Sequence, residues 1–522
     1  MTTWLLEAAR AVPAGVAVGL PVVGPILAAA LVMLVARTVV QRLVSVLTLV
    51  VVGVDALLLL VRVDADGPLA VQAGGWAAPW GITLVADRVA ALFVLTSVVV
   101  LIGVLAYSVG QGLADGAAGR ATARTRYVFH PVYLVLAGGV GFAFLTGDLF
   151  NLFVAFEVML TASYVLITLQ AGPAAVRSAM TYIVVSLLAS VLFVTAVGLV
   201  YAATGTVNFA DLRGAVAELP DNVRLMLALL LLVVFGIKAA LFPLYFWLPD
   251  SYPLAPAPVT AVFAALLTKV GVYAIIRSQT VVFPDDTGVT GPVLLVLAGA
   301  TLLGGILGAI AQNELKRLLS FSIVSSIGFA IMGLGFFTPA GVAGAVFYVV
   351  HSIVIMAALF CVEGLVERRT GTSALDRISG LAHTSPVLGG LFALPALSLA
   401  GFPPFSGFVG KVALIEAGTA AGEWAVVAAA IVVSLLTVYA MALVWGSAFW
   451  GRQSATLPDT DVEDAVVVGV RTLPRLMTWS TAALVGVSLL LPVLGGPLFA
   501  LSLRAADDLL SAQPYVTAVL GG

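Results

Sequence analysis

The sequence predicts an all-α polytopic membrane protein with about fourteen transmembrane helices. Of its 522 residues, 61% are hydrophobic and only 10% are charged, and the mean hydropathy is +1.15. This composition is typical of membrane proteins and not of soluble domains. Apolar runs of about 20 residues, the length that crosses a bilayer, recur along the whole chain. Most of the charged residues lie in the short connections between these runs.

Each predicted span is an apolar segment bounded by turn residues or charges. We expect the helices at residues 14–36, 43–63, 84–107, 128–146, 149–170, 177–203, 223–247, 259–282, 292–312, 318–336, 341–366, 385–418, 424–450 and 477–503. Two amphipathic stretches, 207–219 and 458–474, are expected to lie at the membrane interface.

The distribution of Lys and Arg predicts the orientation in the membrane. Connections after the odd-numbered spans carry 14 of these residues, and the opposite side carries 7. Positive residues are enriched in cytoplasmic loops. Both chain termini are therefore predicted to be extracytoplasmic.

The seventh span contains a buried cation next to a helix breaker. In FGIKAALFPLYFWLPDS, Lys238 lies within an apolar run and Pro243 follows five residues later. An ionisable residue at the centre of a membrane helix costs about 2.5–3.5 kcal/mol. Pro243 has no N–H to donate to the carbonyl of Ala239, so we expect the helix to break close to the amine. A broken helix beside a titratable group is typical of an ion site.

The choice of lysine over arginine indicates proton handling. Only four of the 24 basic residues are lysines, and Lys238, Lys269 and Lys411 lie within apolar runs. An arginine does not release its proton in a protein, whereas a buried lysine can do so near neutral pH. The alternative is that the chain favours arginine throughout and that these lysines form static ion pairs.

A second interrupted span mirrors the first. Residues 385–418 contain Pro395, Pro403 and Pro404, followed by Lys411. The two interrupted spans are five helices apart, so they cross the membrane in opposite directions, as in transporters built from inverted repeats. We therefore divide the chain into N-terminal helices (1–127), a first five-helix repeat (128–282), a second repeat (292–450) and a C-terminal part (451–522).

Five residues are candidates for a proton relay at the middle of the membrane. Glu157 is expected near mid-depth, where pairing with Lys238 would change how readily that lysine holds its proton. Lys269 would pass the proton onward, and His351 could connect it to Lys411. The alternatives are a static Glu157–Lys238 salt bridge, a static Lys269 and a packing role for His351.

The remaining charged residues are less informative. Lys316, beside Glu314 and Arg317, is expected at a solvated helix end. Some acids have no evident role or could serve either as access groups or as ordinary interfacial residues; they are Asp55, Asp148, Asp250, Glu363 and Glu416.

Several classes of function are excluded or disfavoured by the sequence. A net charge of −2 argues against nucleic acid as a partner. One cysteine, Cys361, and three scattered histidines offer no iron–sulfur, haem or other metal motif. No catalytic serine motif or phosphate-binding glycine loop is present. We therefore expect no cofactor, no metal site and no enzymatic activity.

Four motifs together resemble one known family. They are FLTGDLFNLFVAFEVMLTASY (residues 144–164), FGIKAALFPLYFWLPDSYPLAPAPVTAVFAALLTKVGVYAIIR, NELKRLLSFSIVSSIG and LAGFPPFSGFVGK. The chain resembles the antiporter-like membrane subunits shared by respiratory complex I, membrane-bound hydrogenases and the multisubunit Mrp cation/proton antiporters. The first two motifs are most similar to the D-type subunits of Mrp antiporters.

This resemblance places the family's proton-carrying residues on Glu157, Lys238, Lys269 and Lys411. A lysine at position 411 argues against the complex I member that has glutamate there. Many relatives have a lysine where this chain has Met356, so the route near His351 is expected to differ.

The resemblance implies a proton-translocating subunit of a Na⁺/H⁺ antiporter in a bacterial plasma membrane. Such a subunit works with other subunits and exchanges protons for sodium along the Glu/Lys/His relay. One alternative is a proton-pumping subunit of a redox-driven complex, whose neighbours would carry the redox centres. Others are a scaffold that does not transport ions and a transporter that works alone.

Overall fold

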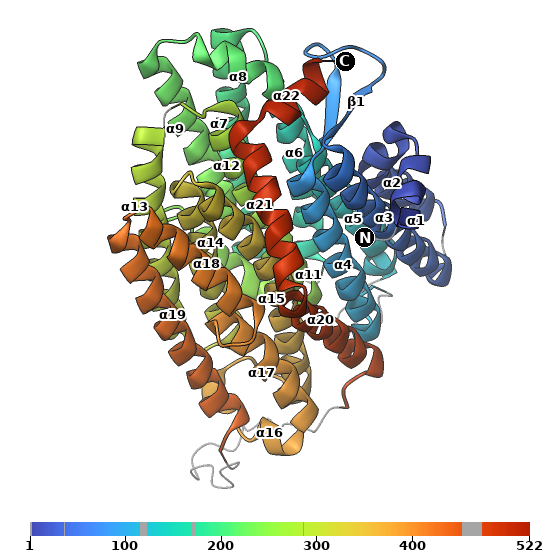
Figure 1. Cartoon of the computed structure of the whole chain (residues 1–522). Helices are drawn as coiled ribbons and strands as arrows, with labels where there is room; N and C mark the ends of the chain where they lie inside the picture. The colour runs from blue at the N-terminus through green and yellow to red at the C-terminus, as the bar shows by residue number, and fades with distance from the viewer. Residues whose placement is uncertain are drawn as a thin grey trace.

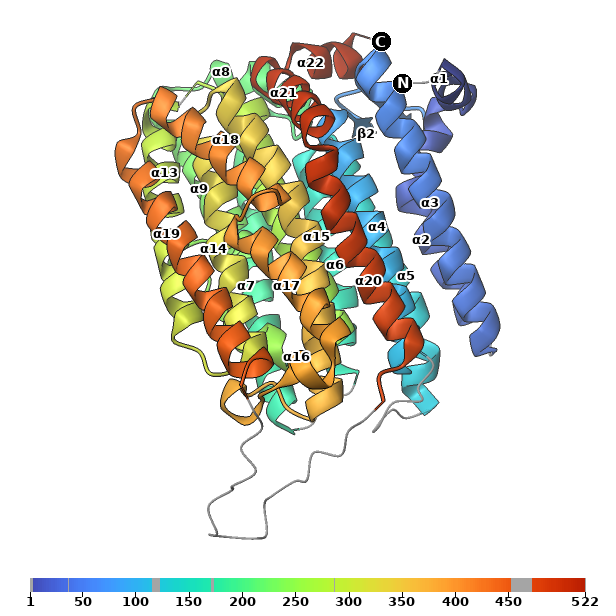
Figure 2. The same ribbon diagram turned by 60° about the horizontal axis from the view of Figure 1, so that its bottom comes forward.

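The computed structural model describes residues 3–35, 37–114, 123–169, 173–285, 287–451 and 472–521. Within these ranges the chain is a bundle of long helices that run side by side (Figures 1 and 2). Thirteen described helical segments are long and apolar enough to cross a bilayer. An interrupted pair of helices fills the place of the remaining predicted span. The predicted all-α polytopic fold is confirmed.

Most predicted spans correspond to single helices. They are α2 (Ala14–Met33), α3 (Thr38–Asp66), α4 (Arg88–Gln111), α5 (Ala123–Leu145), α6 (Leu149–Thr168), α7 (Pro173–Thr204), α13 (Thr287–Ile310), α14 (Leu315–Gly335), α15 (Pro339–Thr370) and α19 (Trp424–Val444). The seventh and last predicted spans begin as α9 (Asp221–Ala239) and α20 (Arg475–Val493) and do not continue as single helices.

The eighth span is composite, with two π-helical turns. It consists of α11 (Ala257–Val262), η2 (Phe263–Leu267), α12 (Thr268–Arg277) and η3 (Ser278–Val282). A third π-helical turn, η5 (Trp445–Phe449), follows α19. The shorter helices are α1 (Thr3–Ala11), α8 (Phe209–Ala217), α10 (Trp247–Ser251), α16 (Leu381–Thr384), α17 (Pro386–Ala400), α18 (Ser406–Ala420), α21 (Gly495–Ser511) and α22 (Gln513–Leu520), with 3₁₀ turns η1 (Tyr252–Leu254) and η4 (Leu375–Arg377).

Both interrupted spans are present, although the first one breaks earlier than its proline. Helix α9 ends at Ala239 because Ala240 adopts a left-handed conformation with φ 60°. The Leu241 N–H then donates to the Gly236 carbonyl at 2.9 Å, which closes the helix end. In the second span, α17 ends at Gly401 with φ 86°, and α18 begins at Ser406.

Three sequence predictions need correction or qualification. Residues 84–86 belong to a strand and not to the third span, because β2 (Ile82–Ala86) pairs antiparallel with β1 (Leu69–Ala73). The last span is not one helix, since it divides at Leu494 into α20 and α21. The stretch 207–219 forms α8 as a short separate helix, whereas most of 458–474 lies outside the described residues.

The first and last helices lie at one end of the bundle. Helices α1 and α22 are both near this end, and so is the β1–β2 hairpin (Figure 2). Helix α21 runs alongside α15 and leads to α22 (Figure 1). The C-terminal helices therefore bind both five-helix units and the N-terminal helices together.

The two five-helix units contain the same backbone motif. In each unit, the N-terminus of the second helix pairs with the segment after the third helix, which begins with a Thr-Gly-Thr turn. The hydrogen bonds are Leu149 N to Val207 O and Phe209 N to Gly147 O in the first unit, and Leu315 N to Ser373 O and Leu375 N to Asn313 O in the second. Equivalent residues are 166 positions apart, as Leu149 and Leu315 are. We infer from this match that 128–282 and 292–450 are structural repeats.

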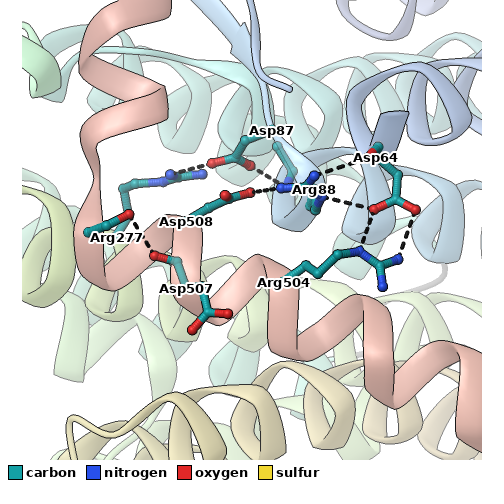
Figure 3. A network of polar contacts seen from close by, with 9 residues as sticks. Asp64, Asp87, Arg88, Arg277, Arg504, Asp507 and Asp508 are labelled. Carbon is teal, nitrogen blue, oxygen red and sulfur yellow. Dashed lines mark hydrogen bonds and ion pairs between the residues drawn. The ribbon is translucent and has the colours of Figure 1, made fainter. Parts of the chain in front are cut away.

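A buried ion network connects helices from distant parts of the chain (Figure 3). Its central pair is Arg277 on α12 and Asp87 at the start of α4, whose side chains are 2% and 4% exposed and 2.6 Å apart. Asp87 also accepts from the Ala90 N–H and so caps α4. The network continues through Arg88–Asp64, Arg88–Asp508 and Arg504–Asp64. It fastens α21 to the rest of the bundle.

Replacing Arg277 with Gln should destabilise the protein strongly. It would leave the Asp87 carboxylate buried without its partner, a change that costs about 3–5 kcal/mol in other buried pairs. Thermal unfolding of the purified protein in detergent measures the effect. Arg10→Gln is the matched control, because the Arg10–Asp66 pair is exposed and should add little stability. Equal melting temperatures for both variants would contradict the prediction.

Candidate functional site

Lys238 and Glu157 are connected through a serine. The Lys238 amine is buried near the end of α9 and donates to Ser190 Oγ at 2.9 Å and to the Ser186 carbonyl at 3.2 Å. Ser190 Oγ in turn donates to the Glu157 carboxylate on α6. The predicted partners are therefore brought together, although Ser190 bridges them in place of a direct salt bridge.

The surroundings of the Lys238 amine are mainly apolar and aromatic. The Phe156 ring centroid lies 5.6 Å from the amine, and Trp247 donates to the Ile237 carbonyl at the broken end of α9. The amine also faces the negative end of the α9 dipole, which favours a positive charge there. The Lys238 amine is thus held by two hydrogen bonds and by the nearby Phe156 ring.

Lys269 is held by the π-helical turn that precedes it. Its amine is 2% exposed and donates to the Ala264 carbonyl at 2.7 Å. In a π-helical turn the backbone bonds shift from i→i+4 to i→i+5, which alters the regular pattern of carbonyl acceptors. We found no sequence signal for this turn, since FAALL has no proline or glycine.

Lys238 and Lys269 lie on helices whose backbones touch. Gly271, two residues after Lys269, packs so closely that a Cβ there would be 2.6 Å from the Ala239 nitrogen and 2.9 Å from the Lys238 carbonyl carbon. This glycine is required for the close approach of α12 to the end of α9. The end of α9 that carries Lys238 is therefore in direct contact with α12, which carries Lys269.

His351 lies at the second broken span. Its Nδ1 is 2.9 Å from Ser406 Oγ, at the first residue of α18, and Ser406 is 3.3 Å from Ser398 Oγ on α17. Its Nε2 is buried and has no hydrogen-bond partner among the described residues. His351 on α15 therefore contacts the start of α18, the helix that carries Lys411.

Lys411 reaches back across the helix break. Its amine is 4% exposed and donates to the Leu399 and Ala400 carbonyls, each at 3.0 Å. These are the last carbonyls of α17, which have no partner within their own helix. The Phe329 ring centroid lies 5.0 Å from the amine. This lysine thus binds the free carbonyls of a broken helix.

Sequence reasoning missed the serines that complete these contacts. Ser186 and Ser190 are four residues apart on α7, so they lie on one face of an apolar helix, which is a usable signal. Ser406 sits directly after the Pro-Pro break. Ser186 and Ser190 bond to Lys238, and Ser406 bonds to His351.

Two other polar residues differ from expectation. Lys316 is not at a solvated helix end, because it is 6% exposed and pairs with Glu367 at 2.7 Å and Glu363 at 4.0 Å. Asp148 is a buried cap of α6 that accepts from the Asn151 N–H. Burial raises the pKa of the Asp148 carboxyl above its ordinary value.

The described residues contain no group of three His, Cys, Asp or Glu side chains that could hold a metal ion. Among the described residues, Ser190 links Glu157 to Lys238. Lys269, His351 and Lys411 bond to backbone carbonyls or to Ser406 and not to one another.

Comparison with known proteins assigns the family. The model of the NADH:quinone oxidoreductase/Mrp antiporter transmembrane family matches residues 146–437. That range contains all five candidate relay residues. The chain belongs to this family.

Individual members of the family are similar over nearly the whole chain. The D subunit of the Na(+)/H(+) antiporter of Alkalihalophilus pseudofirmus is 41% identical over 92% of this chain and 94% of its own length. The corresponding Na(+)/H(+) antiporter protein of Bacillus subtilis is 39% identical over 84% of this chain and 87% of its own. A chain in the solved Mrp complex from Dietzia sp. superposes with a TM-score of 0.89 at 34% identity, covering 97% of this chain and 100% of that one.

Gly271→Ala should destabilise this member of the NADH:quinone oxidoreductase/Mrp antiporter family. The added methyl group would overlap the backbone at Lys238 and Ala239, and overpacking of this kind costs about 1–3 kcal/mol. Thermal unfolding in detergent is the measurement. Gly299→Ala, in α13, is the control because nothing lies within 4 Å of its added Cβ. If the two variants melt together, α12 and α9 do not depend on this contact.

Proposed function

We propose that this chain is a proton-translocating subunit of a multisubunit Na⁺/H⁺ antiporter in a bacterial plasma membrane. It is then part of a secondary transporter and not an enzyme. The observation that carries the proposal is the Glu157–Ser190–Lys238 contact, in a chain 41% identical to the D subunit of a Na(+)/H(+) antiporter. The contact joins an acid and a lysine inside the membrane without locking them in a direct ion pair.

In this proposal protons move along the five candidate residues in sequence. Glu157 controls how readily Lys238 binds a proton, Lys269 passes the proton along the membrane interior, and His351 connects Lys269 to Lys411. Each pKa unit is equivalent to about 1.4 kcal/mol, and moving one charge through 100 mV to about 2.3 kcal/mol. Small changes in the Glu157–Lys238 contact are therefore within the reach of an ion gradient.

Partner subunits are part of the proposal. Glu157 is only half-buried, although it lies in a membrane span. The neighbouring α7 exposes large apolar side chains, among them Val184, Leu188 and Val191. A carboxylate facing lipid is costly, so another subunit that covers this face would remove the cost. The similarity of this chain to one chain of the Mrp complex from Dietzia sp. supports assembly with other subunits.

A redox-driven proton pump remains the rival function. It would use the same buried lysines, and its redox centres would lie in other subunits. The identity to the D subunits of antiporters favours antiport. Electron-donor dependence separates the two functions experimentally.

Lys238→Ala and Lys411→Ala should each abolish sodium-dependent proton movement. The measurement uses everted vesicles from cells that express the whole complex, with variants compared at matched assembly and no electron donor added. Native exchange with inactive variants is the expected result. Full exchange in both variants would make the chain a scaffold, and native activity only with a reductant would identify a redox-driven pump.

Ser190→Ala should slow exchange by about 10- to 100-fold. The substitution removes the hydrogen bonds that link Glu157 to Lys238, and a hydrogen bond to a charged group is worth about 1.5–3 kcal/mol. Initial rates in the same vesicles measure the effect. Ser434→Ala is the matched control, because Ser434 bonds only the Ala430 carbonyl of its own helix. An unchanged rate for Ser190→Ala would remove the serine bridge from the mechanism.

A further inference from the structure

Glu363 is a buried acid that the proposed relay does not use. It lies on α15 with 0% exposure, and neither carboxylate oxygen has a hydrogen-bond partner among the described residues. The Tyr107 hydroxyl on α4 is also buried without a described hydrogen-bond partner, and a Cβ on Gly364 would overlap it. Buried polar groups without protein partners are where ordered water binds. Water bound between α4 and α15 would satisfy both groups.

Two further residues, Lys316 and Glu367, lie between Glu363 and the surface. The Lys316 amine on α14 lies 4.0 Å from Glu363 Oε2 and 2.7 Å from Glu367 Oε2. The Lys316 side chain is 8% exposed, whereas that of Glu367 is 41% exposed. The three residues thus form a series from solvent to a fully buried carboxylate, which we call the Glu363 cluster.

The fold itself does not require charges at these positions. The backbone motif shared by the two repeats relates residues 166 positions apart. By this relation Lys316, Glu363 and Glu367 correspond to Phe150, Val197 and Tyr201 of the first repeat. Phe150 and Tyr201 are 48% and 54% exposed, so only Val197 matches the burial of its counterpart, Glu363. The buried charges at Lys316 and Glu363 are thus a feature of the second repeat that the shared backbone does not require.

The Glu363 cluster lies beside the start of the eighth span, which carries Lys269. At Gly364, a Cβ would also overlap Ala257, so α15 and the start of α11 touch there. The Ala264 carbonyl that holds the Lys269 amine is seven residues further on, about 10 Å of helix rise. The Thr268 hydroxyl beside Lys269 is also buried without a described partner. Proton transfer between Glu363 and Lys269 would therefore need to pass through bound water.

We propose that the Glu363 cluster is a proton access site that connects Lys269 with the end of the bundle holding the C-terminus of α15. A proton from solvent passes by way of Glu367, Lys316 and bound water. It then protonates the Glu363 carboxylate. The neutral acid then gives the proton through water to the neutral amine of Lys269, which becomes an ammonium ion, and Glu363 returns to a carboxylate. The reverse order releases a proton. This inference rests on the proposed function.

The test compares Glu363→Gln with Glu314→Gln in everted vesicles of the whole complex. Glu314 is an exposed acid two residues from Lys316 at the same end of the bundle, so it is a matched control. Glu363→Gln keeps the shape but cannot carry a proton, and exchange should fall at least tenfold at matched assembly. Glu314→Gln should exchange at the native rate. A native rate for Glu363→Gln would overturn the proposal.

Two further variants separate proton transfer from a structural role. Lys316→Arg keeps the positive charge but cannot release a proton, so it should assemble and lose exchange. The triple substitution Lys316→Phe, Glu363→Val and Glu367→Tyr installs the set already accepted by the first repeat, and it should also assemble without exchange. Native exchange in either assembled variant would overturn the proposal.

A measurement on the native complex keeps the proposal testable if the variants fail to assemble. A hydrophobic carbodiimide reacts with protonated carboxyl groups inside membrane proteins, and peptide mass spectrometry locates the adduct. Modification of Glu363 that rises in step with loss of exchange is expected, whereas full modification of Glu363 with exchange at the native rate would overturn the access site. If Lys238→Ala is inactive while Glu363→Gln is fully active, only this inference fails. If the native complex shows no exchange, the proposed function fails.

Discussion

The structure depends on one constraint, which is that an amine inside a bilayer must have hydrogen-bond acceptors. Most carbonyls of a regular helix already accept a backbone hydrogen bond, so acceptors for a buried amine come from interrupted helices, from side chains or from carbonyls that accept a second bond. Lys411 uses the last carbonyls of α17, Lys269 uses a π-helical turn, and Lys238 uses Ser190 and the Ser186 carbonyl of α7. The helix interruptions thus make Lys269 and Lys411 tolerable, and the serines of α7 do so for Lys238.

Two kinds of buried charge serve different purposes in this bundle. Arg277 and Asp87 form a direct pair at 2.6 Å, in which the arginine keeps its proton and the charges neutralise each other. Lys238, Lys269 and Lys411 instead bond to carbonyls and a hydroxyl, which hold the amine without requiring a fixed opposite charge. The first arrangement stabilises the packing of α4 against α12. In the second arrangement, no carboxylate among the described residues bonds directly to the amine.

The inferred repeats share a backbone and differ in their polar residues. Ser190 bridges Glu157 and Lys238 in the first unit, while the position 166 residues later is Met356. Conversely, the acidic Glu363 corresponds to Val197. Membership of the NADH:quinone oxidoreductase/Mrp antiporter family accounts for the common architecture. The differences indicate that the two units carry out different steps of the proposed proton path.

The sequence by itself determined the membrane class, nearly all the spans and the buried lysines. Hydrophobic length and the cost of burying a charge are local properties, so Lys238, Lys269 and Lys411 stood out from their neighbours alone. Only the tertiary structure decided the partners: Ser190 for Lys238, the Ala264 carbonyl for Lys269, and Glu367 for Lys316. The β1–β2 hairpin, the early end of α9 and the burial of Lys316 were missed for the same reason. They depend on contacts between segments far apart in the chain, and helix periodicity carries no record of which faces meet.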